Sequence, residues 1–179
     1  LDMLKKQGMK DLVLDLQGNG GGYLRAAQEM ADQFLDDRKL IVYTEGRTSP
    51  REDLYASSTG KFEKGRLVVM VDEGSASASE IVTGAMQDWD RAVVVGRRSF
   101  GKGLVQRPVM LPDGSAVRLT VARYYTPSGR CIQKSYADGL DAVSYTHLRA
   151  HETVLDLVCR LLLEKKKHIA NHKVSDDDT

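Results

Sequence analysis

Apolar and polar residues alternate along this chain in two patterns, one typical of strands and one typical of helices. Short, mostly apolar segments bounded by polar residues predict strands at residues 11–16, 40–44, 66–72 and 92–96. Helical spacing of apolar residues follows over residues 23–36 and again from residue 77 onwards. The apolar face of the first helix comprises Leu24, Ala27, Ala31, Phe34 and Leu35, and that of the second comprises Ile81, Val82, Ala85, Met86 and Trp89.

The second half of the chain turns to extended segments. Residues 104–111 and 116–125 predict two strands joined by a turn at residues 112–115. Residues 45–65 are polar and rich in Ser, Arg and Gly, and they predict a loop. Strand, helix, strand, helix and strand, followed by a hairpin, predict an α/β layered domain.

Length and charge exclude several classes of protein. The chain has 179 residues, enough for one ordinary domain with a real core, and its 41% hydrophobic and 28% charged residues are typical of a globular protein. A formal net charge of +1 gives no bulk attraction to nucleic acid. No apolar run approaches the ~20 residues of a membrane helix, and no signal peptide is expected at the first residues. A start without Met suggests a fragment.

The positions of histidine and cysteine exclude further chemistry. All four histidines, His147, His151, His168 and His172, lie in the last 33 residues, so chemistry within residues 1–146 cannot use a Ser-His-Asp triad or a His-ligated zinc. The two i,i+4 histidine pairs could chelate a metal on a helix, but no carboxylate or thiol converges on them, and a solvated helix face is the favoured interpretation. Two cysteines, Cys131 and Cys159, predict neither a disulfide framework nor a metal site. We expect no metal and no cofactor.

Two glycine-rich segments resemble nucleotide-binding loops and fail the comparison. Residues 96–102 match the start of a phosphate-binding loop, but Gly103 stands where a hydroxyl would hold magnesium, and the next segment has a strand pattern containing Pro108. Residues 18–22 lack the third glycine of a dinucleotide loop, because Tyr23 occupies its position. That glycine run is either a tight turn or a set of accessible N–H groups that can hold an anion, including an oxyanion.

A run of small residues at 75–80 allows two interpretations. Ser77 and Glu80 form a capping box at a helix start. Alternatively, Ser77 is a nucleophile at a strand-to-helix turn, where the next N–H group and the helix dipole stabilise negative charge. A serine without histidine needs another base, and a lysine serves only if its pKa falls from ~10.4 toward neutrality. Lys102, between two glycines, is either that base or an exposed turn residue.

Four stretches together resemble one known family. They are residues 14–22 (LDLQGNGGG), 74–80 (GSASASE), 99–106 (SFGKGLVQ) and 122–129 (ARYYTPSG). Residues from about 8 to 140 resemble the protease core of the carboxyl-terminal processing peptidases, or tail-specific proteases, which are serine–lysine endopeptidases. The family's serine and lysine are 25 positions apart, as Ser77 and Lys102 are, and its glutamine follows four residues later, here Gln106.

The resemblance implies a role for each matching residue. Ser77 would be the nucleophile, Lys102 the general base and Gln106 the group that orients the lysine amine. The oxyanion donors would be the N–H of Ala78 and one from Gly21 or Gly22. Lys102 and Gln106 have the same parity on an extended segment, so we expect them to face the same side. The implied fold stacks strand-strand-helix units, similar to crotonases and Clp proteases.

The resemblance also implies a setting, and it has limits. It implies a protein or peptide substrate with an accessible C-terminus and a location in the bacterial cell envelope (periplasm), and it leaves the oligomeric state open, a homo-oligomer included. Gln17 stands where the family usually has arginine, and the family's export signal, N-terminal helical region and PDZ domain are not in this sequence. The alternative is therefore a truncated, non-catalytic module for peptide binding or assembly. Residues 1–143 are expected to be a partial protease core, and residues 144–179, including a helix at 154–167, a tail not native to the family.

Overall fold

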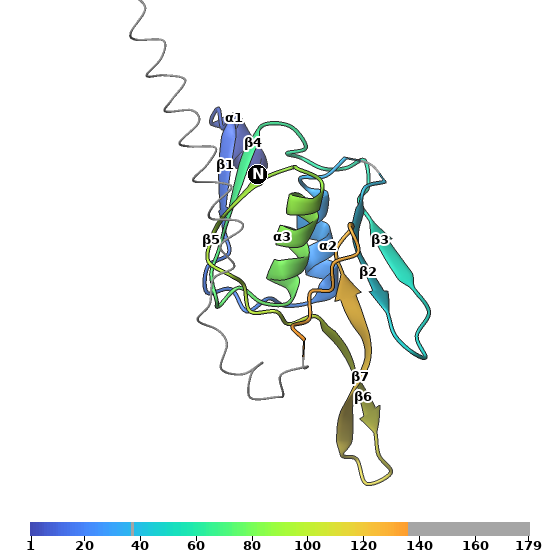
Figure 1. Cartoon of the computed structure of the whole chain (residues 1–179). Helices are drawn as coiled ribbons and strands as arrows, with labels where there is room; N and C mark the ends of the chain where they lie inside the picture. Colours follow the sequence, from blue (N-terminus) through green and yellow to red (C-terminus); the bar gives the residue numbers. More distant parts are fainter. Residues whose placement is uncertain (37, 136–179) are drawn as a thin grey trace, which may run out of the picture.

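A parallel sheet, a pair of helices and an antiparallel sheet form the layers of this α/β fold (Figure 1). The computed structural model describes residues 1–36 and 38–135. The described elements are α1 (Asp2–Lys6), β1 (Asp11–Asp15), α2 (Leu24–Asp32), β2 (Leu40–Glu45), β3 (Glu52–Tyr55), β4 (Arg66–Val71), α3 (Ala78–Asp88), β5 (Val93–Gly96), β6 (Leu104–Met110) and β7 (Ala116–Tyr125). The predicted α/β class is confirmed.

The first sheet has the strand order β1-β4-β5, and both of its pairings are parallel. Asp11 pairs with Arg66 at one end of β1, and Val68 pairs with Val93 in the next pair of strands. Since the strands are parallel and adjacent, the loops that follow β1, β4 and β5 all leave from the same edge of the sheet. The predicted glycine, serine and lysine motifs occupy those three loops.

The second sheet has the order β3-β2-β7-β6, with every pairing antiparallel. Helices α2 and α3 pack against each other and contact β2, so they lie between the two sheets, as Figure 1 shows. The side chains with the least exposure come from all three layers. The largest fully buried ones are Leu35, Ile41, Met86, Val42, Val69 and Val82. The predicted helix faces therefore do line the core, at Ala27, Ala31, Phe34 and Leu35 and at Ile81, Val82, Ala85 and Met86.

Four details of the predicted elements are wrong. Within the predicted loop at residues 45–65, strand β3 forms; it is short, charged and at the sheet edge, which hides it from a hydrophobicity pattern. Helix α2 ends at Asp32, because Gln33 and Phe34 donate to carbonyls only three residues back. Trp89 lies past the end of α3, is 40% exposed and donates to the Leu40 carbonyl. Strand β5 is not buried, since Val93 is 49% exposed at the edge of its sheet.

The β6–β7 hairpin extends away from the layers (Figure 1). Its apolar residues near the turn, Val109, Met110, Val117 and Leu119, are all exposed. Residues 96–102 are followed by strand β6 and not by a helix. A phosphate-binding loop precedes a helix, so this agrees with the conclusion that the segment is not one. The predicted tail at 144–179, the four histidines and Cys159 lie outside the described residues. Within residues 1–36 and 38–135, no helix is long and apolar enough to cross a membrane.

Candidate active site

Three loops meet at the carboxyl edge of the parallel sheet. They are the glycine turn (residues 18–22) after β1, the serine turn (residues 72–77) after β4, and the lysine loop (residues 97–103) after β5. Loops at this edge are where open α/β sheets build their binding sites. Backbone hydrogen bonds join the loops directly, since Ala76 N–H donates to Asn19 O at 3.0 Å and Phe100 N–H donates to Ser75 O at 2.9 Å.

Ser77 has a strained backbone at the junction between the serine turn and helix α3. Its φ is 57° and its ψ is −113°, a conformation that residues with a side chain rarely adopt. An ordinary N-cap serine has an extended backbone, so capping α3 does not require this geometry. A sharp strained turn from strand to helix is the arrangement that exposes a nucleophilic serine at the top of a sheet. The geometry therefore favours the nucleophile over a cap alone.

A buried carboxylate links the serine turn to the lysine loop. Glu80, on the first turn of α3, is 6% exposed. Its Oε2 accepts hydrogen bonds from Ser77 N–H at 2.8 Å and Lys102 N–H at 2.9 Å. Its Oε1 accepts from Ser99 Oγ at 2.7 Å and Gly101 N–H at 2.6 Å. The predicted capping contact from Glu80 back to the Ser77 backbone is present, and the same side chain also holds the lysine loop in place.

The glycine turn is pressed against Ser77 and its neighbours. A Cβ atom added to Gly21, whose φ is +90°, would lie 2.4 Å from Ala76 O and 2.7 Å from Ala78 N. The N–H of Gly21 donates to Asn19 Oδ1 at 2.9 Å. In the described part of the chain, the N–H groups of Gly22 and Ala78 have no protein acceptor. Of the predicted donors, Ala78 and Gly22 are therefore available for an oxyanion, whereas Gly21 supplies the close approach.

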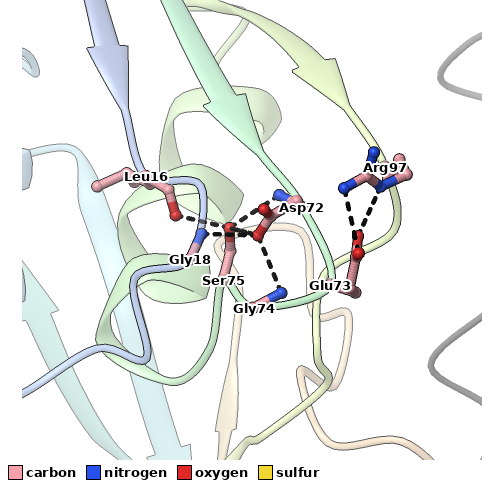
Figure 2. A network of polar contacts seen from close by, with 7 residues as sticks. All are labelled: Leu16, Gly18, Asp72, Glu73, Gly74, Ser75 and Arg97. Atoms are coloured by element: carbon pink, nitrogen blue, oxygen red, sulfur yellow. Dashed lines mark hydrogen bonds and ion pairs between the residues drawn. The ribbon is translucent and has the colours of Figure 1, made fainter.

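A polar network fixes the glycine turn to the serine turn (Figure 2). Asp72 Oδ1 accepts from Gly18 N–H at 2.8 Å and from Gly74 N–H at 2.9 Å. Ser75, which is fully buried, donates through Oγ to Leu16 O at 2.7 Å and accepts from Asp72 N–H at 2.9 Å. The Gly18 N–H, followed by the Gly74 N–H and the Ser75 hydroxyl, stabilises the ionised form and holds the pKa of Asp72 below its usual value, against a desolvation effect smaller than that of Gly18.

Outside this network, Glu73 and Arg97 form an ion pair at the rim of the same turn (Figure 2). Arg97 Nε lies 2.6 Å from Glu73 Oε2, and the two side chains are 61% and 41% exposed, respectively. The hydrogen bond from Arg97 lowers the pKa of Glu73. Because exposed pairs contribute little in water, this pair is not expected to organise the site.

The side chains of Lys102 and Gln106 are exposed. Lys102 precedes β6, whose register with β7 shifts between Val105 and Gln106. The lysine loop is also held from its other side, where Gly103 N–H donates to Gln133 Oε1 at 2.9 Å. Behind that loop, burial, and then the charge of Arg98, lowers the pKa of Lys134. The structure thus brings the backbones of Ser77 and Lys102 together through Glu80, and the joint facing of Lys102 and Gln106 stays a prediction.

An apolar pocket opens beside the glycine turn. Its volume is about 120 Å³, and its lining includes Gly21, Gly22 and Ala78. Its remaining wall is mostly apolar, formed by Leu16, Asn19, Ala26, Ala27, Met30, Ser79 and Val82. A space of this size next to the proposed oxyanion donors suits one small aliphatic side chain.

Sequence reasoning missed three residues that build the site. In the sequence, Asp72 is only the end of a predicted strand and Ser75 only part of a run of small residues. An Asp whose side chain can bond to the backbone two residues on, here at Gly74, is a common turn signal that could have singled out Asp72. Nothing in the sequence near Gln133 indicates that it bonds to the lysine loop, since the two segments meet only through the β6–β7 hairpin.

Comparison with known proteins decides the family. The sequence model of peptidase family S41 matches residues 1–141. The chain belongs to peptidase family S41. The resemblance to carboxyl-terminal processing peptidases that the four stretches predict is thereby confirmed.

Relatives of this S41 chain are bacterial and chloroplastic. It is 46% identical over 134 residues to the carboxyl-terminal-processing protease of Picosynechococcus sp., which covers 75% of this chain and 32% of that protein. It is 39% identical over 160 residues to the C-terminal processing peptidase, chloroplastic, of Tetradesmus obliquus, which covers 89% of this chain and 33% of that protein. The solved photosystem II D1 C-terminal processing protease superposes with a TM-score of 0.69 at 44% identity, over 73% of this chain and 34% of its own. The S41 chain thus spans about a third of the length of these relatives.

Proposed function

We propose that this chain is the core of a serine endopeptidase that cleaves proteins near their C-termini. The observation that carries the proposal is the strained backbone of Ser77 at the strand-to-helix turn. That turn lies against a glycine turn with accessible N–H groups, and a shared carboxylate joins it to the loop of Lys102. Membership of family S41 and the similarity to carboxyl-terminal processing proteases support the same reaction.

The reaction would proceed through an acyl-enzyme. Ser77 Oγ attacks the scissile carbonyl carbon while a neutral Lys102 amine takes the hydroxyl proton. The N–H groups of Ala78 and Gly22 donate to the developing oxyanion, where fixed backbone dipoles need no reorganisation. The lysine returns the proton to the leaving amine, and water then hydrolyses the Ser77 ester by the same steps in reverse order. Gln106 would orient the lysine amine.

The surroundings of Ser77 suggest what enters the site. An extended substrate that placed its carbonyl between Ala78 and Gly22 would direct one side chain into the apolar pocket. We propose protein or peptide tails with a small aliphatic residue before the cleaved bond. The bacterial relatives carry the name of carboxyl-terminal processing proteases, and we propose the bacterial cell envelope as the setting of this chain.

The proposal is tested by the products of cleavage. The chain and its Ser77→Ala variant are each incubated with an unstructured protein that carries an isotope-labelled C-terminal segment, and the products are sequenced by mass spectrometry. We expect cuts close to the labelled end, after small aliphatic residues, with the wild type only. An intact substrate would contradict proteolysis and favour the peptide-binding module. Cuts that persist in Ser77→Ala would exclude Ser77 as the nucleophile.

A further inference from the structure

Asp72 is not one of the proposed catalytic residues. Its carboxylate lies between the glycine turn and the serine turn, which carry the proposed oxyanion donors and the nucleophile. The residue directly follows β4, so it starts the turn that leads to Ser77. Its Oδ1 atom accepts from Gly18 in the glycine turn and from Gly74 in the serine turn. One oxygen therefore holds one end of each turn, as Figure 2 shows.

The glycine turn and the serine turn are in close backbone contact. A Cβ added to Gly74 would lie 2.9 Å from Gly18 Cα, so the two backbones touch directly beneath the Asp72 carboxylate. Farther along, the Ala76 N–H bond to Asn19 O and the packing of Gly21 against Ala76 and Ala78 continue the same contact. The carboxylate thus anchors the end of this interface nearest the sheet, and the oxyanion donors lie at the other end.

We infer that Asp72 is a positioning residue that sets the gap between the Ala78 and Gly22 N–H groups by holding the glycine turn against the serine turn. This inference rests on the proposed function, since it concerns the oxyanion site of that reaction. Ser75 supports the same joint, but its hydroxyl bonds to the Leu16 carbonyl and not to the glycine turn itself. Among the side chains drawn in Figure 2, that of Asp72 accepts from an N–H of the glycine turn, while the backbone carbonyl of Leu16 accepts from Asn19 N–H at 3.1 Å.

An aspartate suits this role for a chemical reason. Backbone N–H donors from two different loops need an acceptor that can take both, and an ionised carboxylate does so with charge-assisted strength. An asparagine keeps one acceptor oxygen of similar position but without the charge. Alanine removes the acceptor and leaves the Gly18 and Gly74 N–H groups to water. The effect on the reaction should follow that order, because a displacement of about 1 Å in a reacting geometry can cost about 10²-fold in rate.

The test measures phosphonylation by a fluorophosphonate probe, in which a bond from Ser77 Oγ to phosphorus forms, the phosphorus–fluorine bond breaks with release of fluoride, and the hydroxyl proton passes to the base. The full chain is compared with Asp72→Asn, Asp72→Ala and Glu73→Gln, the last removing a neighbouring carboxylate that pairs with Arg97. We expect the maximal labelling rate to fall about 10-fold to 100-fold in Asp72→Ala and less in Asp72→Asn. The probe concentration for half-maximal rate should change little, and Glu73→Gln should label as the wild type does.

Amide hydrogen exchange gives a readout that does not depend on catalysis. We expect faster exchange at residues 18–22 in Asp72→Ala and no change there in Glu73→Gln. Wild-type labelling in Asp72→Ala, an equal loss in Glu73→Gln, or a loss fully explained by a smaller folded fraction would overturn the inference. If neither the wild type nor Ser77→Ala is labelled, the proposed function fails. In that case, amide exchange at residues 18–22 still decides whether Asp72 orders the glycine turn. If exchange there is the same in Asp72→Ala as in the wild type, the inference is overturned.

Discussion

The backbone N–H groups of Ser77 and Lys102 donate to one and the same atom, Glu80 Oε2, at 2.8 and 2.9 Å. The two residues are 25 positions apart and belong to loops that follow different strands. A single buried carboxylate therefore sets the spacing between the backbone of the proposed nucleophile and that of the proposed base. Glu80 lies on the first turn of α3, and Ser77 is the N-cap of the same helix. The position of α3 therefore determines where both loops are held.

Replacing Glu80 by glutamine should disturb both loops. A glutamine side chain presents an NH₂ group in place of one acceptor oxygen, so it cannot satisfy the N–H donors on both sides. Leaving a buried donor unpaired costs about 1–3 kcal/mol, and we expect a loss of that order in the free energy of unfolding together with a large loss of probe labelling. Ser99→Ala is the matched control, because it removes one contact to Glu80 and leaves the three backbone bonds. A Glu80→Gln variant labelled as fast as Ser99→Ala would contradict this role.

Substitutions at Ser77 separate strain from capping. The positive φ of Ser77 should be relieved by glycine and not by alanine, and such strain is worth about 1–3 kcal/mol. We expect Ser77→Gly to be at least as stable as the wild type and Ser77→Ala to be less stable than Ser77→Gly by about 1 kcal/mol, with neither variant labelled. If Ser77 were only a cap, glycine would itself cost a few tenths of a kcal/mol. Urea unfolding of the three proteins distinguishes these outcomes.

Adjacent glycines offer a matched pair for the glycine turn. Gly21→Ala would place a Cβ 2.4 Å from Ala76 O at a positive φ, whereas Gly20→Ala meets nothing within 4 Å. We therefore expect Gly21→Ala to lose at least about 1 kcal/mol of stability and most of its labelling, because the glycine turn must move away from Ser77. Gly20→Ala should be close to wild type in both measurements. Equal behaviour of the two variants would show that the close approach has no consequence.

The charge state of Asp72 gives a pH dependence with a definite sign. Its hydrogen bond from Gly18 lowers the folded-state pKa below the usual 3.8. The stability that this carboxylate contributes is therefore fully present above pH 3.8 and is lost as the pH falls through the lowered pKa of the folded state. We expect the difference in unfolding free energy between the wild type and Asp72→Asn to be largest near pH 7 and to shrink toward pH 2. A difference that is constant with pH would mean that ionisation does not matter.

Much of the fold follows from the order of apolar segments. The strands at Leu12–Leu14 and Leu67–Val71 and the helix faces at Ala27–Leu35 and Ile81–Met86 are visible because each buries one face or stripe of regular spacing. Strand β3 is not visible, because two of its four residues are charged and its hydrogen-bonded partner β2 is found only through the fold. The assignment of β2 to a different sheet from β1 and β4 is also hidden, since sheet membership depends on long-range pairing that no local pattern records.

The candidate site divides in the same way. Ser77, Glu80, Gly21 and Lys102 stand in recognisable motifs, and the capping box predicts the local bond between Glu80 and Ser77. The bond from Lys102 to Glu80 could not be predicted, because it joins two loops through the fold. The same holds for Asp72, whose partner Gly18 lies 54 residues away in the sequence. Sequence motifs can indicate which residues carry out the chemistry. The residues that hold the loops together can be identified only once the fold has brought those loops to one edge of the sheet.

The most direct test of the Ser77–Lys102 assignment is to map the fluorophosphonate adduct by tandem mass spectrometry in four proteins: wild type, Lys102→Arg, Lys102→Met and Lys134→Arg. A guanidinium does not deprotonate in this pH range, so arginine cannot replace a lysine base. Lys134 is the control, because burial lowers its pKa but the residue lies behind the lysine loop. We predict an adduct on Ser77 in the wild type and in Lys134→Arg and none in either Lys102 variant, with all four equally folded. An adduct on Ser77 in Lys102→Arg, or its loss in Lys134→Arg alone, would contradict Lys102 as the base.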